Sequence, residues 1–157
     1  MFLQNLRAKV GARLNGDSEA GFTLIELLVV MLILGILAAI ALPAFFNQKE
    51  KAGDAKAKEY AHSAQVAMET YSTDHNGSYV GATPAELEEI EPTLSSADLT
   101  VTGPAKAGAP TADQYTIGSE APNSGNIYYV ENDAGTLTFE CTTEKTGGCP
   151  AGGDWGE

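Results

Sequence analysis

The chain has 157 residues, of which 9 are Lys or Arg and 21 are Asp or Glu, so its formal net charge is −12. This length fits one domain, or one domain with an additional special segment. The acidic balance argues against a nucleic-acid-binding protein, because contact with phosphates needs clustered basic side chains. With 17 Gly and 7 Pro, the composition also excludes a collagen-like or generally disordered chain.

An uncharged apolar run of 20 residues occupies positions 27–46. As a helix it would be about 30 Å long, which is the thickness of the hydrocarbon core of a bilayer. Three basic residues precede the run, at Arg7, Lys9 and Arg13, and they favour a cytoplasmic N-terminus. We therefore expect the chain to be held in the cytoplasmic membrane by this run, and the residues after Phe46 to be exported.

Three interpretations of the run predict different mature proteins. A secretory signal peptide would be cut at the small residues Ala39-Ile40-Ala41, so that the mature chain would begin near Leu42. A plain membrane anchor would stay uncut. A pilin signal would be cut in front of the apolar run, so the residues there distinguish the three.

The sequence from residue 21 reads GFTLIELLVV, and it resembles the prepilin peptidase site of type IV pilins and type II secretion pseudopilins. The resemblance implies cleavage after Gly21, methylation of the new amine of Phe22, and an assembly role for Glu26 at the fifth mature position. It also covers Gly35 and Pro43, which fall where many pilins of this family carry Gly and Pro. The 21-residue leader is longer than is usual for type IVa pilins of diderm bacteria.

The chemistry of Glu26 agrees with this resemblance. A carboxylate in the centre of a bilayer costs about 2.5–3.5 kcal/mol on insertion scales. Cleavage after Gly21 would create a positive amine on Phe22, and Glu26 can pair with that amine in its own chain or in a neighbouring one. In the family the neighbour's amine is implicated in the register of assembly, so we expect Glu26 to be needed for filaments.

Gly35 and Pro43 predict a weak stretch of helix. Pro43 has no N–H and cannot bond to the carbonyl of Ala39, and Gly35 is a poor helix former. We expect a helix break between them, because in many related filaments this stretch is extended. The alternative is close helix packing at small residues with an ordinary proline kink.

Apolar side chains continue at helical spacing after residue 46, and they predict that the same helix extends to about residue 73. The stripe consists of Tyr60, Ala64, Ala67, Met68 and Tyr71. Asp74-His75-Asn76-Gly77 then ends the helix, with Gly in a left-handed cap. We interpret the stripe as core packing that needs a cover.

The remaining residues predict that cover. Thr83-Pro84-Ala85-Glu86 is typical of a helix start, and Pro92 stops that helix. Short strands are expected at residues 99–102, 115–118, 127–130 and 137–141, with a hairpin turn at 132–135. The predicted fold is α+β: a long N-terminal helix packed on a small antiparallel sheet, which is the ladle fold of pilins. The expected organisation is a leader (1–21), a membrane or filament-core helix (22–46) and an exported head (47–157).

Cys141 and Cys149 lie eight positions apart in the exported part. A disulfide is the favoured interpretation, because that compartment is oxidising. A metal pair lacks further ligands, and the spacing is not that of a Cys-x-x-Cys redox pair. His62 and His75 are isolated, and the carboxylates of residues 86–91 have no calcium-loop spacing, so we expect no metal and no cofactor.

The residues contain no catalytic motif, and we expect no enzyme. The predicted function is a structural subunit of a type IV pilus-like filament, a homo-oligomer displayed at the cell surface. Its expected partners are a prepilin peptidase, an assembly platform and an ATPase-driven machine, without direct binding of nucleic acid by the shaft. The alternatives are a type II secretion pseudopilin or a competence pilin, and, in a different class, a membrane-anchored binding domain that does not polymerise.

Overall fold

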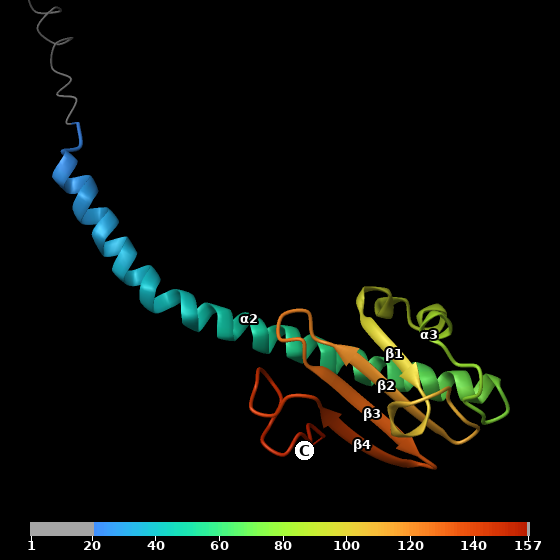
Figure 1. The fold of residues 1–157 in the computed structure, drawn as a ribbon. Helices are drawn as coiled ribbons and strands as arrows, with labels where there is room; N and C mark the ends of the chain where they lie inside the picture. Colours follow the sequence, from blue (N-terminus) through green and yellow to red (C-terminus); the bar gives the residue numbers. More distant parts are fainter. Residues whose placement is uncertain (1–20, 157) are drawn as a thin grey trace, which may run out of the picture. The chain divides into compact units, whose positions relative to one another are not determined.

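The computed structural model describes residues 21–156, and the chain divides into two compact units, Met1–Leu42 and Pro43–Glu157. The leader interpretation falls on residues that lie outside the described part, except for Gly21. Helix α2 spans Leu24–Asp74, with Pro43 inside it. The helix predicted to end near residue 73 is therefore confirmed, and Figure 1 shows its second part beside the sheet.

The predicted break between Gly35 and Pro43 is not present in this structure, where both residues are helical. A single proline removes one backbone hydrogen bond, and most of its neighbours are good helix formers such as Ala39, Ala41 and Ala44. The local propensity therefore outweighs the loss of that bond.

Every residue from position 21 to 49 is exposed. Large apolar side chains of the run are 48% exposed at Val29 and 73% exposed at Ile40. Among the described residues, α2 is the one helix that is long and apolar enough to cross a membrane. An apolar surface of this extent in a soluble chain would be an association site.

The second unit contains a four-stranded antiparallel sheet in the order β1-β2-β3-β4. The strands are Asp98–Thr102 (β1), Gln114–Glu120 (β2), Ile127–Asp133 (β3) and Thr136–Cys141 (β4). All four predicted strands are present, and each is longer than expected by at least one residue. The hairpin between β3 and β4 turns at Ala134 and Gly135, which both have positive φ.

Two further short elements join the helix to the sheet. Helix α3 spans Pro84–Ile90, and the hydroxyl of Thr83 accepts a hydrogen bond from the backbone N–H of Glu86, as the sequence predicts. A 3₁₀ helix at Pro92–Ser96 was not expected; it buries Leu94 completely. Helix α2 itself ends in a left-handed turn at Asn76 and Gly77, and the Gly77 N–H donates to the carbonyl of Ser72.

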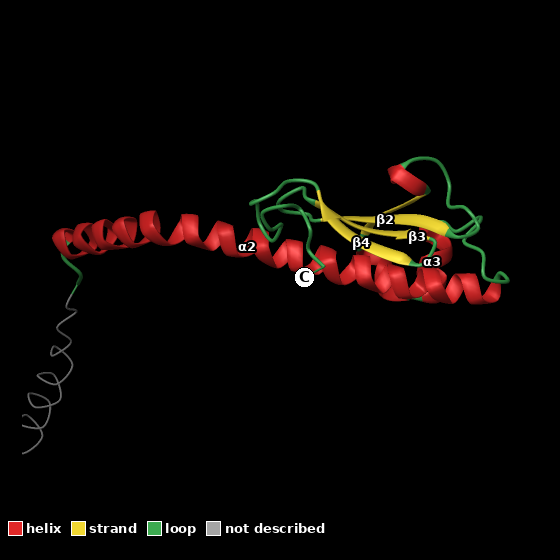
Figure 2. Cartoon of the chain, turned by 90° about the horizontal axis from the view of Figure 1, so that it is seen from below, coloured by secondary structure: helices red, strands yellow, loops and turns green. Residues whose placement is uncertain are grey.

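The sheet covers the second part of α2, as Figure 2 shows from below. The face of α2 that it covers is made largely of alanines, which are at most 2% exposed: Ala57, Ala61, Ala64 and Ala67. One cluster adds Met68 and Tyr71 from α2 to Leu87, Leu94, Tyr115 and Ile117. The other joins the first two alanines to Ala121, Tyr128, Val130, Cys149 and Trp155. The predicted stripe is thus core packing, although Tyr60 is only half-buried.

Candidate functional site

The segment around the predicted cleavage site is accessible. Gly21 is exposed, and a Cβ added there would have no atom within 4 Å. The Phe22 side chain is 82% exposed. Residues 21–23 precede the first turn of α2 and are not helical. An exposed peptide outside a helix is accessible to a peptidase.

Thr23 and Glu26 start the helix together. The Glu26 carboxylate accepts hydrogen bonds from the backbone N–H of Thr23 at 2.8 Å and from its hydroxyl at 2.7 Å, and the Glu26 N–H donates to the Thr23 hydroxyl at 3.3 Å. This reciprocal arrangement is a capping box. It gives Glu26 a role in the isolated chain that the sequence analysis did not assign, although the Thr-x-x-Glu spacing at 23–26 was a sufficient signal.

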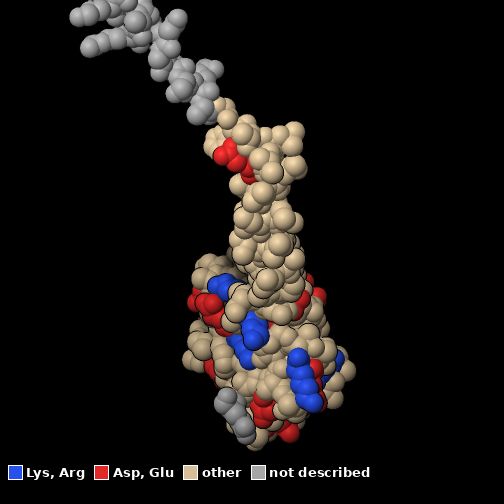
Figure 3. Space-filling model, turned by 90° about the vertical axis from the view of Figure 1, so that its left-hand side faces the viewer, with Lys and Arg blue, Asp and Glu red and all other residues tan. Residues whose placement is uncertain are grey.

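Glu26 is also the only charged residue between positions 21 and 48. Figure 3 shows the apolar part of α2 as almost uniformly uncharged, whereas acidic and basic groups are scattered over the visible face of the second unit. The Glu26 carboxylate is therefore the one charged side chain in this part of α2 that could fix how such helices align if they pack together.

The C-terminal loop is closed by the Cys141–Cys149 disulfide, with 5.9 Å between the two Cα atoms. The predicted pairing is confirmed. Cys149 is buried in the cluster of Tyr128 and Trp155, and the indole N–H of Trp155 donates to the carbonyl of Glu140 at 2.9 Å. The bridge thus fastens the tail to the end of β4.

Asp54 holds this loop against α2. Its buried carboxylate accepts hydrogen bonds from the hydroxyl of Ser124 and from the backbone N–H of Gly148. Lys58, one turn further along α2, donates to the carbonyl of Gly148 at 2.8 Å and lies over the ring of Tyr128. Burial lowers the pKa of Lys58, while the Asp54 carboxylate opposes that shift. The sequence analysis assigned no role to this pair.

Glu69 of α2 accepts hydrogen bonds from two tyrosines at the other end of the sheet. Its carboxylate accepts hydrogen bonds from the hydroxyls of Tyr79 at 2.9 Å and Tyr115 at 2.8 Å. Burial first, and then the neighbouring carboxylate, raise the pKa of both tyrosines above its ordinary value. The sequence pattern predicts only that Glu69 lies off the apolar stripe of α2, because periodicity alone cannot show which polar groups the strands bring to a helix.

The two histidines pack against aromatic rings. The ring of His62 lies 4.9 Å from that of Trp155 and 5.5 Å from that of Phe139, between centroids, and His75 stacks on Tyr71 at 3.8 Å. Within residues 21–156 no three His, Cys, Asp or Glu side chains are grouped so that they could hold a metal ion.

Comparison with known proteins adds the family. The family model described as the prokaryotic N-terminal methylation motif matches residues 17–42. The chain is 31% identical over 123 residues to the type IV major fimbrial protein FimA of Dichelobacter nodosus, covering 76% of each protein. It is 32% identical over 125 residues to the type IV wide pilus major component PilA4 of Thermus thermophilus, covering 80% of this chain and 82% of that protein.

A shorter match links the chain to the type II secretion system core protein G of Pectobacterium carotovorum subsp. carotovorum, which is 40% identical over 62 residues. That match spans only 40% of this chain and 40% of the secretion protein. No solved structure matches the chain significantly. The class is defined by a long N-terminal helix on an antiparallel sheet, a methylation motif at the start of that helix, and relatives whose matches extend beyond it. The chain belongs to the type IV pilin family.

Proposed function

We propose that the chain is the precursor of the structural subunit of a type IV pilus-like filament. The observation that carries this proposal is the extent of the match: pilus major components align with 76–80% of this chain, which is more than the N-terminal helix, at 31–32% identity. The secretion protein aligns with about 40% of it. Relatedness beyond the shared N-terminal helix favours the pilus over the pseudopilin and the competence pilin.

In this proposal a prepilin peptidase cuts after Gly21 and Phe22 receives a methyl group on its new amine. Residues 22–46 hold the subunit in the cytoplasmic membrane, with residues 47–157 exported, until an assembly platform and its ATPase extract it. The helices then pack in the filament core and the heads form its surface. The exposed apolar face of α2 supports this, because each side chain from position 27 to 46 is free to pack against other copies or lipid.

The weak stretch between Gly35 and Pro43 keeps a role in this proposal. An added Cβ at Gly35 would meet nothing within 4 Å in the single chain, so close packing inside the chain does not explain the glycine. We infer that these two positions let the segment extend when neighbouring helices compete for its backbone groups.

The mass of the mature N-terminus tests the processing. An N-methylated Phe22 terminus is expected, whereas a terminus near Leu42 would show ordinary signal-peptidase cleavage and contradict the proposal. Electron microscopy of fibres sheared from the cell surface then tests the assembly, with labelling by an antibody against the head. Long labelled fibres are expected; their absence from cells that display the processed subunit would favour the pseudopilin or an anchored domain that does not polymerise.

A further inference from the structure

The basic residues of this acidic chain are concentrated at one place. Six Lys or Arg follow Gly21, and four of them lie at positions 49, 51, 56 and 58, directly after the apolar run ends at Phe46. If the leader is removed, these four are the only basic side chains near either end of the run. They work against the preference of basic residues for the cytoplasmic side, so their position needs another explanation.

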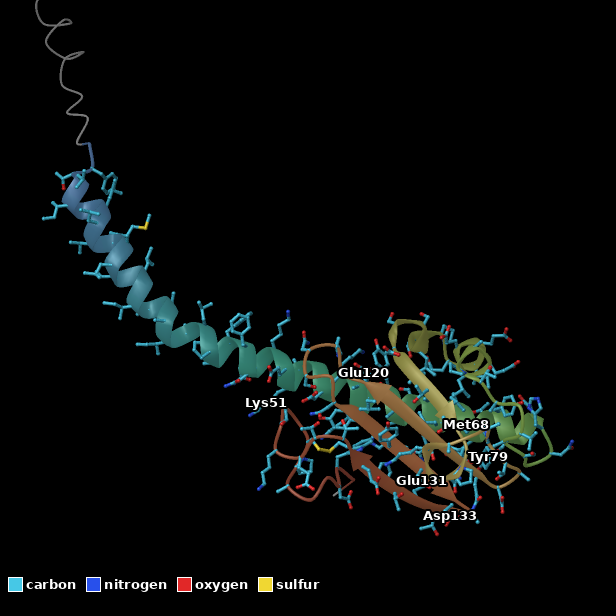
Figure 4. All side chains as sticks on the ribbon, viewed as in Figure 1. Lys51, Met68, Tyr79, Glu120, Glu131 and Asp133 are labelled. Atoms are coloured by element: carbon cyan, nitrogen blue, oxygen red, sulfur yellow. A yellow bond between two sulfur atoms is a disulfide. The ribbon has the colours of Figure 1, made fainter. Side chains whose placement is uncertain are left out.

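Two of the four lysines make polar contacts with other residues of the head. Lys56 forms an ion pair with Glu59 at 3.1 Å, and Lys58 donates to the carbonyl of Gly148. Lys49 and Lys51 are exposed, and their ammonium groups make no hydrogen bond or ion pair within residues 21–156. Figure 4 shows Lys51 on α2 before the sheet begins to cover the helix.

The distance of this pair from Phe46, where the apolar run ends, follows from the geometry of the helix. Lys49 and Lys51 lie three and five residues after Phe46, so they follow it by about 4.5 Å and 7.5 Å along the axis. A headgroup layer adds roughly 5–8 Å to each side of the hydrocarbon core. The exposed rings of Phe45 and Phe46 end the run. Both ammonium groups therefore fall at headgroup depth when the run fills the bilayer.

The direction of the two side chains favours lipid over a single protein partner. Two residues correspond to a turn of about 200° around a helix, so Lys49 and Lys51 point to opposite sides of α2. A headgroup layer surrounds a helix and can contact both at once, whereas one neighbouring acidic head reaches one side.

We propose that Lys49 and Lys51 bind the headgroups of anionic phospholipids in the leaflet from which the head emerges, and so help to retain the subunit in the membrane before assembly. The inference rests on the proposed membrane placement. Each basic residue close to an anionic surface is worth about 1 kcal/mol, or about fivefold in association. Extraction into a filament has to break both contacts.

The test measures lipid selectivity around the processed full-length chain in phosphatidylcholine vesicles that contain a trace of spin-labelled lipid. The fraction of immobilised label gives the association of phosphatidylglycerol relative to phosphatidylcholine. We expect a preference of about twofold or more, because two sites with about fivefold preference are averaged with shell lipids that have none. Raising the salt concentration should weaken it.

Three variants make the comparison specific. Lys49→Gln with Lys51→Gln should bring the preference close to one, and Lys49→Arg with Lys51→Arg should keep it. Lys145→Gln removes the same charge from the exposed C-terminal loop and should leave it unchanged. Equal association of the two lipids with the wild type, or a preference that survives the double Gln change, would overturn the proposal. Cross-linking with a reagent that does not react with amines, in vesicles without anionic lipid, tests whether the pair binds a second copy instead. Dimers that form in the wild type and are lost in the double Gln variant would also overturn the proposal.

Failure of the proposed function gives a different result. The N-terminal mass of the same sample reports whether the chain is cut, and extraction with alkaline carbonate reports whether it is inserted. An uncut chain contradicts the processing, but the difference between wild type and the double Gln variant tests the lipid contact in either form. A chain that carbonate removes contradicts membrane placement and with it the lipid contact.

Discussion

The carboxylate of Asp54 on α2 accepts a hydrogen bond from the backbone N–H of Gly148, which lies 94 positions further along the chain. The same carboxylate accepts from Ser124 in the loop between β2 and β3. One buried charge therefore connects the helix with two loops of the sheet, at the end of the head where α2 enters it.

Replacing Asp54 by Ala should lower the free energy of unfolding by about 2–4 kcal/mol, because two hydrogen bonds to a charged acceptor are lost and their donors stay partly buried. Thermal unfolding followed by circular dichroism in detergent measures the effect. Asp74→Ala is the matched control, since that exposed carboxylate makes no hydrogen bond in the described chain. Equal stability of the two variants would contradict the anchoring role of Asp54.

Gly147 permits this contact in two ways. It has φ of +60°, and a Cβ at this position would overlap the Asp54 carboxylate. Gly108 has φ of +69° with nothing within 4 Å of an added Cβ. Gly108→Ala should therefore cost about 1–2 kcal/mol for the left-handed backbone alone, and Gly147→Ala about 1–3 kcal/mol more for the overlap. Chemical denaturation of both variants separates the two costs; a similar loss in both would mean that the loop moves away freely.

Two fully buried tyrosines should respond differently to the loss of their hydroxyls. Tyr115 donates to Glu69, whereas the Tyr128 hydroxyl has no hydrogen-bond partner within the described chain. Tyr115→Phe should cost about 1–3 kcal/mol, because the bond to a charged acceptor is lost. Tyr128→Phe should change stability at neutral pH by less than about 1 kcal/mol. A large loss in Tyr128→Phe would show that its hydroxyl has a partner in solution.

The pKa of Tyr128 predicts how the stability of the fold changes in alkali. Burial raises the pKa of Tyr128 from 10.0 to about 12. Between pH 10 and pH 12 the folded chain keeps the hydroxyl proton that the unfolded chain has lost. The contribution of Tyr128 to stability is therefore fully present below pH 10 and is lost as the pH rises through 12. Stability should therefore fall between these values, and less steeply in Tyr128→Phe. Unfolding titrations at successive pH values check the slope; identical slopes in wild type and variant would contradict the shift.

How far the sequence predicts this fold depends on how local each feature is. The cap at Thr83 and the left-handed turn at Gly77 are present as expected, because each is decided by a few neighbouring residues. The roles of Asp54 and Glu69 were not predictable. Their partners lie up to 94 residues away and are chosen by the register of the sheet, which no periodicity contains.

The helix break at Gly35 and Pro43 illustrates the opposite case. The residues have the chemistry of a weak helix, yet the single chain stays helical there because nothing else competes for its backbone groups. The capping box of Thr23 and Glu26 is predictable from the Thr-x-x-Glu spacing alone, whereas the resemblance to a pilin signal implies only a role for Glu26 in assembly.

Glu26 can be tested so that its two roles separate. Gln can replace Glu in a capping box, so Glu26→Gln keeps the helix start but removes the charge, whereas Glu26→Ala removes both. If the charge orders assembly, both variants should be inserted and cleaved but form no filaments. Fibre counts by electron microscopy, with mass spectrometry of the N-terminus, measure this. Normal fibres from Glu26→Gln together with none from Glu26→Ala would assign the requirement to the cap.

The disulfide joins cysteines that lie eight positions apart, and for a loop of this size the loss of chain entropy in the unfolded state is worth about 2.5 kcal/mol. Reduction, or Cys141→Ser with Cys149→Ser, should lower stability by about this amount and expose Trp155, the only tryptophan of the chain. A red shift of its fluorescence reports the exposure. Unchanged fluorescence after reduction would show that Asp54 and Lys58 hold the tail unaided.

The packing of Trp155 also determines the order in which the two core clusters can form during synthesis. A ribosome makes residues 57 and 61 early, but the ring that covers them belongs to the third residue from the end of the 157-residue chain. The half of the head that contains these two alanines therefore stays open until residue 155 has been made, while the cluster around Met68 and Leu87 can form before it. A subunit without Trp155 would keep the cluster around Met68 folded and leave Ala57 and Ala61 uncovered, so one ring that is made late completes the core of the head.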